Sequence, residues 1–170
     1  IMTSEINLQL VSQLTRDNIA VQLSECSLAR NYTTNLRIDY HHGLEQLIDH
    51  LYDLGHRSIA FVAGRPGSES TDLLLKAYEN LMNTFGLIHG TVLPGNLLFE
   101  GGLAASVTIV KICPRPTAVI AINDLTALGV IKGLLKKGFR VPQDISVTGF
   151  GNTRFAEYSN PSITSVDIRR

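Results

Sequence analysis

The stretch DLGHRSIAFVAG, residues 53–64, contains the end of a helix, a tight turn and a strand. Gly55 follows a series of leucines at helical spacing and is placed to end that helix. The segment SIAFVA at 58–63 is a continuous apolar run of strand length. Strands that are apolar on both sides are typical of parallel sheets with helices on both faces. The stretch therefore predicts an α/β fold.

Segments on both sides repeat the alternation of strand and helix, which predicts βαβ units with right-handed crossovers. Asp124 is expected to cap the helix that follows it, and Gly138 to end that helix. Further strands are expected at 19–23, 36–38, around 97–99, and at 118–122, 145–150 and 163–168. Further helices are expected from Thr3 or Ser4 onward and at 43–54, 72–85, 102–112 and 125–137.

The overall composition excludes several classes of protein. Hydrophobic residues make up 44% of the 170 residues, which indicates a globular chain. The 15 Lys and Arg residues equal the 15 Asp and Glu residues, so the chain lacks the positive excess of a DNA-binding surface. No apolar run approaches the ~20 residues that span a bilayer. Cys26 and Cys113 are expected to be buried free thiols, and the expected location is the cytoplasm.

The first residues suggest that the chain is a piece of a longer protein. Ile1 and Met2 lead straight into a helix start, as the tail of a strand would. The start has neither the basic nor the apolar region of a signal peptide.

Motifs for catalysis, nucleotide binding and metal binding find little support. The loop GRPGSES at 64–70 lacks the Gly-Lys-Ser/Thr ending of a phosphate-binding loop. His41, His42 and Glu45 share part of a helix face but lack the spacing of a zinc site, so a solvated face is expected. No nucleophile motif is present, and no cofactor or metal is predicted.

The carboxyl ends of the strands are the expected ligand site, because open parallel sheets bind ligands there. The loops after Ala63, Ile122 and Phe150 converge at that edge. Asn123 offers both a hydrogen-bond donor and an acceptor, which suits a polyol or the edge of a nucleobase.

Four stretches together resemble the lactose-repressor/galactose-repressor (LacI/GalR) family of transcription regulators. They are DLGHRSIAFVAG at 53–64, PTAVIAINDLTALGVIKGL at 116–134, GFRVPQDISVTGF at 138–150 and NPSITSV at 160–166. The resemblance implies a two-lobed, periplasmic-binding-protein-like (type I) fold with an incomplete N-terminal lobe. Residues 1–38 and 164–170 would form part of that lobe, and residues 39–163 the C-terminal lobe.

The resemblance also implies an effector site and a dimer interface. Asn123 and Asp124 match the family's Asn-Asp pair, and Glu25 ends a strand where the family usually has Asp. Leu97 falls where the family often has an aromatic ring, and Ser70 would add a polar contact. The dimer interface would include Leu128, Ile131, Phe155 and Tyr158.

Two positions depart from the family pattern. Leu74 stands where the family has an arginine that clamps the effector, and Gly151 where it has an aspartate. Losing a bidentate cation and a carboxylate removes groups that orient a sugar. We therefore expect an effector less hydroxylated than a free hexose, or a site that has lost small-molecule sensing.

The expected function is that of the effector-sensing and dimerisation domain of a bacterial transcription repressor. A ligand between the lobes would shift their closure and so the spacing of the DNA-binding heads in a homodimer. DNA contact would come only from a helix-turn-helix absent from this chain. The alternatives are a solute-binding protein of a transport system and, less favoured, an α/β enzyme with an unrecognised site.

Overall fold

The computed structural model describes residues 7–24, 31–87 and 90–168. The contacts divide the chain into two units, residues 1–38 and residues 39–170. The boundary after Ile38 follows the short strand β2, and Asp39 caps the first helix of the second unit by accepting a hydrogen bond from His42 N at 2.9 Å.

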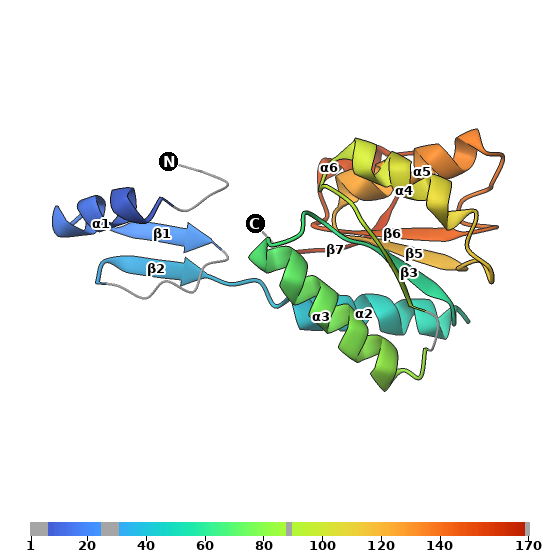
Figure 1. Ribbon diagram of the computed structural model, residues 1–170, viewed down its shortest axis with the longest axis horizontal. Coiled ribbons are helices and arrows are strands. Elements are labelled where there is room, and N and C mark those ends of the chain that lie inside the picture. Colours follow the sequence, from blue (N-terminus) through green and yellow to red (C-terminus); the bar gives the residue numbers. More distant parts are fainter. Residues whose placement is uncertain (1–6, 25–30, 88–89, 169–170) are drawn as a thin grey trace. The chain divides into compact units, whose positions relative to one another are not determined.

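The first unit contains one helix and a two-stranded parallel sheet (Figure 1). Helix α1, Leu8–Arg16, begins at Asn7, whose side chain accepts hydrogen bonds from the amides of Gln9 and Leu10. The expected caps Thr3 and Ser4 lie outside the described residues. Strand β1, Val21–Ser24, pairs with β2, Thr33–Leu36. Both strands form a few residues away from the expected ranges.

The second unit is built on a five-stranded parallel sheet with the order β4-β3-β5-β6-β7. This confirms the predicted parallel α/β fold. Strands β3 and β5 lie in the interior of the sheet and are buried along their whole length, as their apolar sequences predict. The strands are β3 Ile59–Val62, β4 Thr91–Leu93, β5 Ala118–Ala121, β6 Ser146–Phe150 and β7 Thr164–Val166.

Helices cover both faces of this sheet. Figure 1 shows α2 and α3 on one face and α4, α5 and α6 on the other. They are α2 Tyr40–Asp53, α3 Glu69–Thr84, α4 Phe99–Ile109, α5 Asp124–Lys136 and α6 Arg154–Tyr158. Gly55 and Gly138 follow α2 and α5 with φ of 88° and 83°, so the prediction that these glycines end helices is confirmed. Among the described helices, none has both the length and the apolar character needed to cross a bilayer.

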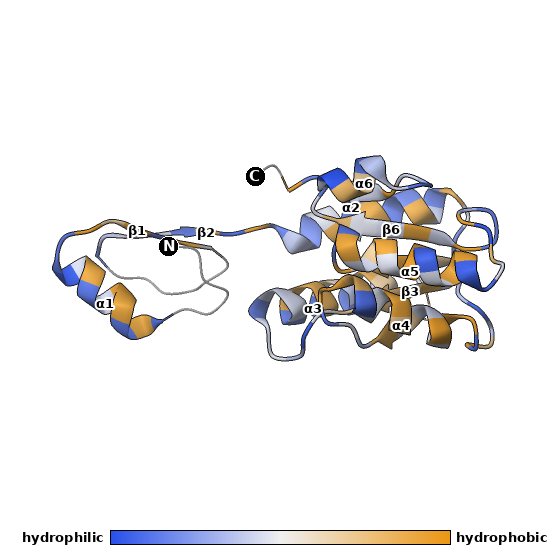
Figure 2. Ribbon diagram, turned by 90° about the horizontal axis from the view of Figure 1, so that it is seen from above, coloured by the Kyte–Doolittle hydropathy of each residue, from blue (hydrophilic) through white to orange (hydrophobic). Residues whose placement is uncertain are grey.

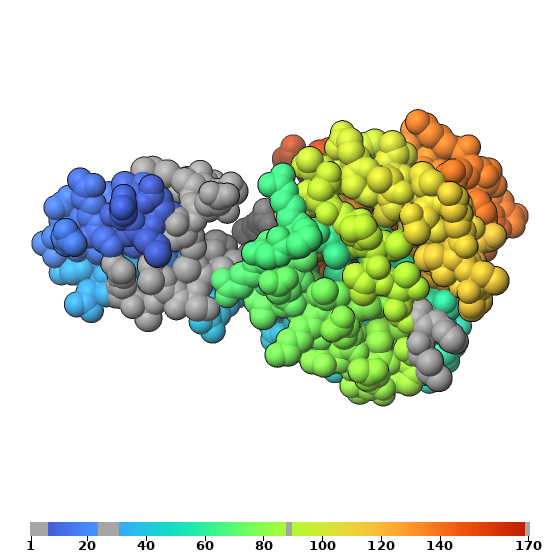
Figure 3. Space-filling view, in the orientation of Figure 1, coloured from blue at the N-terminus to red at the C-terminus, as the bar shows by residue number. Residues whose placement is uncertain are grey.

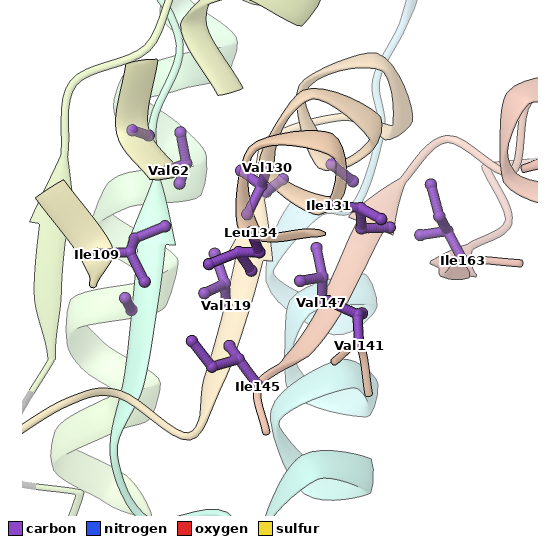
Figure 4. Close-up of a cluster of buried hydrophobic side chains, with 14 of the residues drawn as sticks. Val62, Ile109, Val119, Val130, Ile131, Leu134, Val141, Ile145, Val147 and Ile163 are labelled. Atoms are coloured by element: carbon purple, nitrogen blue, oxygen red, sulfur yellow. The ribbon is translucent and has the colours of Figure 1, made fainter. Parts of the chain in front are cut away.

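The main hydrophobic cluster lies between the sheet and helices α4 and α5 (Figure 4). Val119, Leu134 and Ile145 are fully buried there. Figure 2 shows that α4 is mainly hydrophobic along its length. Half-buried side chains from the same face, including Leu128 and Phe139, pack against the cluster.

Helices α4 and α5 approach closely enough for backbone to meet backbone. A β-carbon at Gly129 would clash with the Phe99 carbonyl and lie 2.9 Å from Leu103 N. A β-carbon at Gly102 would clash in the same way with the Thr126 carbonyl. The close contact of the two helices therefore depends on glycine at both positions.

Two expectations about local structure are wrong, namely the strand at 97–99 and the burial of Cys113. No strand forms at 97–99, because residues 97–98 lead directly into α4 and the strand of this region, β4, is earlier. The sequence did not indicate α6, which is only five residues long. Residues 164–166 pair with β6 inside the second unit, and a lobe that joins residues 164–170 with residues 1–38 stays a prediction. Cys113 is exposed because it lies in the proline-bounded loop after α4; Cys26 lies outside the described residues.

Substitution of Gly129 by alanine should destabilise the protein by about 1–3 kcal/mol through overpacking. The direction of this change is informative, because the same substitution at an exposed helix position should stabilise the helix by ~1 kcal/mol. Urea unfolding followed by circular dichroism measures the change. Lys132→Ala, at an exposed position of the same helix, should change the unfolding free energy by less than about 0.5 kcal/mol. Equal stabilities of the two variants would contradict the close helix contact.

Candidate ligand site at the carboxyl edge of the sheet

Strands β3, β5 and β6 of the second unit end at the same edge of the sheet, because all its strands are parallel. The polar residues that follow β5 and β6 are Asn123, Asp124, Asn152 and Thr153. The residues that follow β3 form the loop that leads to α3. This edge gathers most of the candidate site residues.

Asn123 is the N-cap of α5. Its side-chain oxygen accepts a hydrogen bond from Thr126 N at 2.8 Å, and its Nδ2 donates to the Leu97 carbonyl at 2.9 Å. The prediction that Asp124 caps this helix is wrong, because Asp124 is already its first residue. Asn123 is half-buried, and its amide therefore joins the loop before α4 to the start of α5.

Asp124 has a fully buried carboxylate that accepts hydrogen bonds from two segments. Thr153 donates to it through its backbone N at 2.6 Å and its Oγ1 at 2.8 Å. Ser165, in β7, donates through its Oγ at 2.5 Å. A buried carboxylate is stable only when its oxygens are paired in this way. Asp124 therefore holds the ends of β5, β6 and β7 together and has no free surface for a ligand.

The loop after β6 adopts a conformation that suits glycine. Gly151 has φ of 120° and Asn152 has φ of 47°. Gly151 N donates to the Val166 carbonyl at 2.8 Å, and Asn152 N donates to Ser165 Oγ at 3.0 Å. Gly151 thus lies at the expected edge, but it offers no side chain there.

The β3 side of the edge is mainly apolar. Leu97 is half-buried, and its Cδ2 lies 2.8 Å from the point where a β-carbon at Gly64 would be. Ser70 is half-buried in the first turn of α3, with its Oγ 3.0 Å from Ser68 Oγ. Leu74 is only 3% exposed, so little of its side chain is available to a ligand. Glu25 lies outside the described residues.

Two groups with shifted pKa values, His56 and Asp144, lie at the other edge of the sheet. Burial lowers the pKa of His56, which precedes β3 and whose Nδ1 lies 2.9 Å from Thr117 Oγ1. The hydrogen bonds from Arg140 lower the pKa of Asp144, before β6, to about 2. Among residues 7–24, 31–87 and 90–168, no group of three His, Cys, Asp or Glu side chains is placed to hold a metal ion.

The candidate dimer residues differ in exposure. Phe155 and Tyr158 of α6 are 53% and 72% exposed, which is unusual for large aromatic side chains. Leu128 is half-buried against the core. Ile131 is 2% exposed and belongs to the core cluster, so little of its side chain is available to a partner, and its place in a dimer interface stays a prediction.

Residues 48–169 match the family described as periplasmic binding protein-like domain. The chain belongs to the periplasmic binding protein-like domain family. Catabolite control protein A of Priestia megaterium is 29% identical over 97% of this chain and 51% of its own length. A LacI transcriptional regulator from a Rhodococcus species superposes with a TM-score of 0.87 at 27% identity, over 98% of this chain and 62% of that one.

The resemblance to LacI-type regulators is thereby confirmed. The lactose operon repressor of Klebsiella pneumoniae is 28% identical over 77% of this chain and 37% of its own length. The chain spans about half the length of the first of these relatives. Of the two positions at which the resemblance implies a departure from the family pattern, Leu74 is buried and Gly151 has no side chain.

Sequence reasoning missed the partners of Asp124. Thr153 and Ser165 lie 29 and 41 residues from it along the chain, so no local spacing links them. The one available signal was position: both residues are small and polar, Thr153 follows β6 closely and Ser165 lies within β7. It also missed Gly149, where a β-carbon would clash with the Asp124 carboxylate.

Substitution of Asp124 by asparagine should lower the free energy of unfolding by about 2–4 kcal/mol. The new side-chain NH2 group would face the donor groups of Thr153 or Ser165, so hydrogen bonds to the carboxylate would be lost. Ser165→Ala removes one donor and should cost less, about 1–2 kcal/mol. Asp49→Asn, at an exposed position of α2, is the control and should have little effect. Chemical denaturation measures all three; an Asp124→Asn variant as stable as the control would disprove the network's role.

Proposed function

We propose that this chain is the effector-sensing and dimerisation domain of a bacterial transcription repressor. The relatives named above support this assignment, because the protein from Klebsiella pneumoniae is the lactose operon repressor by name and the one from Rhodococcus is a transcriptional regulator. The function needs no covalent chemistry. Such a regulator would act in the cytoplasm, bind DNA through a helix-turn-helix segment elsewhere in the protein, and form a homodimer.

The observation that carries the proposal is the position of Thr153. Its backbone N and Oγ1 donate to Asp124 at the ligand edge, and the same residue is the N-cap of α6. Helix α6 presents the exposed rings of Phe155 and Tyr158. A change at the ligand edge that moves Thr153 must therefore move the surface that we assign to the dimer.

The proposed mechanism is a shift of population between two conformations. A ligand that binds one of them more tightly increases its share. Operator half-sites require a fixed separation of DNA-binding heads, so only one conformation would bind DNA well. The effector would contact Asn123, Ser70 and Leu97. The buried Leu74 and the missing side chain at Gly151 favour an effector less hydroxylated than a free hexose.

The first test concerns the dimer. The chain should sediment as a dimer at micromolar concentration, and Phe155→Ser combined with Tyr158→Ser should weaken dimerisation by about a hundredfold, because buried aromatic side chains dominate interface energies. Val92→Ser, at an apolar position 38% exposed on β4, is the control and should leave the dimer intact.

The same variants can be tested for regulation. Fused to a DNA-binding head that represses only as a dimer, the chain should repress a reporter gene, and the double variant should lose that repression. The chain can also be sedimented at about 100-fold higher concentration, which would reveal a dimer with a hundredfold weaker dissociation constant. A chain that is still monomeric there would favour a solute-binding protein instead.

The second test concerns the ligand class. In calorimetric titrations, D-glucose should bind no more tightly than millimolar, because no arginine or aspartate stands at positions 74 and 151 to orient its hydroxyls. The dissociation constants of adenine and D-ribose, measured in the same way, show whether the site prefers a nucleobase or a smaller sugar. Micromolar binding of D-glucose would contradict the inferred class.

A further inference from the structure

Thr71 has a buried hydroxyl without a hydrogen-bond partner. The described residues include five buried polar side chains, namely Thr71, Ser106, Asp124, Thr126 and Thr148. The other four make hydrogen bonds to protein atoms, whereas Thr71 Oγ1 makes none. An unpaired buried polar atom is costly and rare, so it requires an explanation.

The hydroxyl points toward the ligand edge of the sheet. Thr71 lies in the first turn of α3, and a β-carbon at Gly64, just after β3, would clash with Thr71 Oγ1. The same β-carbon would lie 2.8 Å from Leu97 Cδ2 and 2.9 Å from Ile122 Cδ1. Thr71 Oγ1 and two apolar side chains therefore surround the Gly64 α-carbon. Figure 3 shows α3, in green, and the segment that leads into α4, in yellow-green, on the same side of the second unit.

Leu97 covers this position in a strained conformation. Its φ is 69°, in the left-handed region that is unfavourable for leucine. Its carbonyl accepts a hydrogen bond from Asn123 Nδ2, which fixes the backbone. The side chain is half-buried. Residues held in such conformations gather at ligand sites and switches.

We propose that Thr71 Oγ1 is the polar contact of a ligand subsite that opens when the Leu97 side chain turns away from Gly64. This inference rests on the proposed function and names part of its ligand. The ligand group that enters carries one hydroxyl or amino group on an apolar edge, because the three atoms nearest to this position are the unpaired Thr71 Oγ1 and the apolar Leu97 Cδ2 and Ile122 Cδ1.

The charges around the subsite favour a neutral ligand. The N-terminus of α3 would by itself attract an anion. Its first turn, however, carries Glu69 and Asp72, both exposed, and the preceding loop supplies only Arg65 as a cation. The two carboxylates outweigh that cation.

The first arm of the test measures stability without ligand. Thr71→Val removes the unpaired hydroxyl and should raise the melting temperature of the full 170-residue chain by about 2–6 °C. Thr148→Val is the matched control: Thr148 is 2% exposed, and its Oγ1 donates to the Val119 carbonyl at 3.4 Å. That variant should melt at the same or a lower temperature. A lower melting temperature for Thr71→Val would overturn the proposal.

The second arm measures binding by methyl NMR with cyclopentanol, cyclopentane and D-ribose as probes. Cyclopentanol should shift the Leu97 methyl signals saturably and bind more tightly than either other probe. Thr71→Val should weaken cyclopentanol binding about two- to tenfold, whereas Thr148→Val should not change it. Gly64→Ala should abolish it by filling the subsite.

Unchanged cyclopentanol binding in Thr71→Val, or no shift at Leu97, would overturn the subsite. Neither result bears on the proposed dimer or on the proposed regulator function, because sedimentation and reporter repression do not depend on Thr71. A monomeric chain that still binds cyclopentanol through Thr71 would instead retain the subsite and reject the regulator function.

Discussion

One buried carboxylate organises the functional edge of this protein. Asp124 has no contact with solvent, and both its oxygens accept hydrogen bonds from residues far away in the sequence. The arrangement satisfies a charge that would otherwise be very costly inside the protein. It also fixes the loop after β6 relative to α5 and β7. The conformation of Gly151 and Asn152 and the start of α6 depend on that anchor.

The sequence predicted the regular parts of the fold well, because burial on two faces leaves a strong pattern. The apolar runs at β3, β5 and β6 and the glycines after α2 and α5 gave strands and helix ends close to those observed. The sequence pattern did not place the short elements correctly, since α6 has a single helical turn and β4 only three residues. The interface residues were expected from the resemblance alone, and the burial of Ile131 in the core cluster is a tertiary property that no local pattern records.

The site was predicted less completely than the fold. Asn123 was expected at the ligand edge and lies there, but its amide already holds Leu97 and Thr126. The hydrogen bonds of Asp124 to Thr153 and Ser165 could not be predicted, and they make it an internal support of this edge. No pattern marks Thr71, because a threonine on a helix gives no sign in the sequence that its hydroxyl lacks a partner. These properties arise from three-dimensional contacts between distant residues, which local patterns do not record.

The neighbourhood of Gly149 and Asp124 has an evolutionary consequence. Any side chain at 149 would occupy the space of the carboxylate, so a larger residue becomes acceptable only after Asp124 has been shortened. Shortening Asp124 first would strand the donors Thr153 and Ser165. Each substitution alone should lower the stability of the protein, and the stability changes caused by substitutions at residues in contact do not add. The pair is therefore epistatic, and lineages with this geometry should keep both residues or exchange them together.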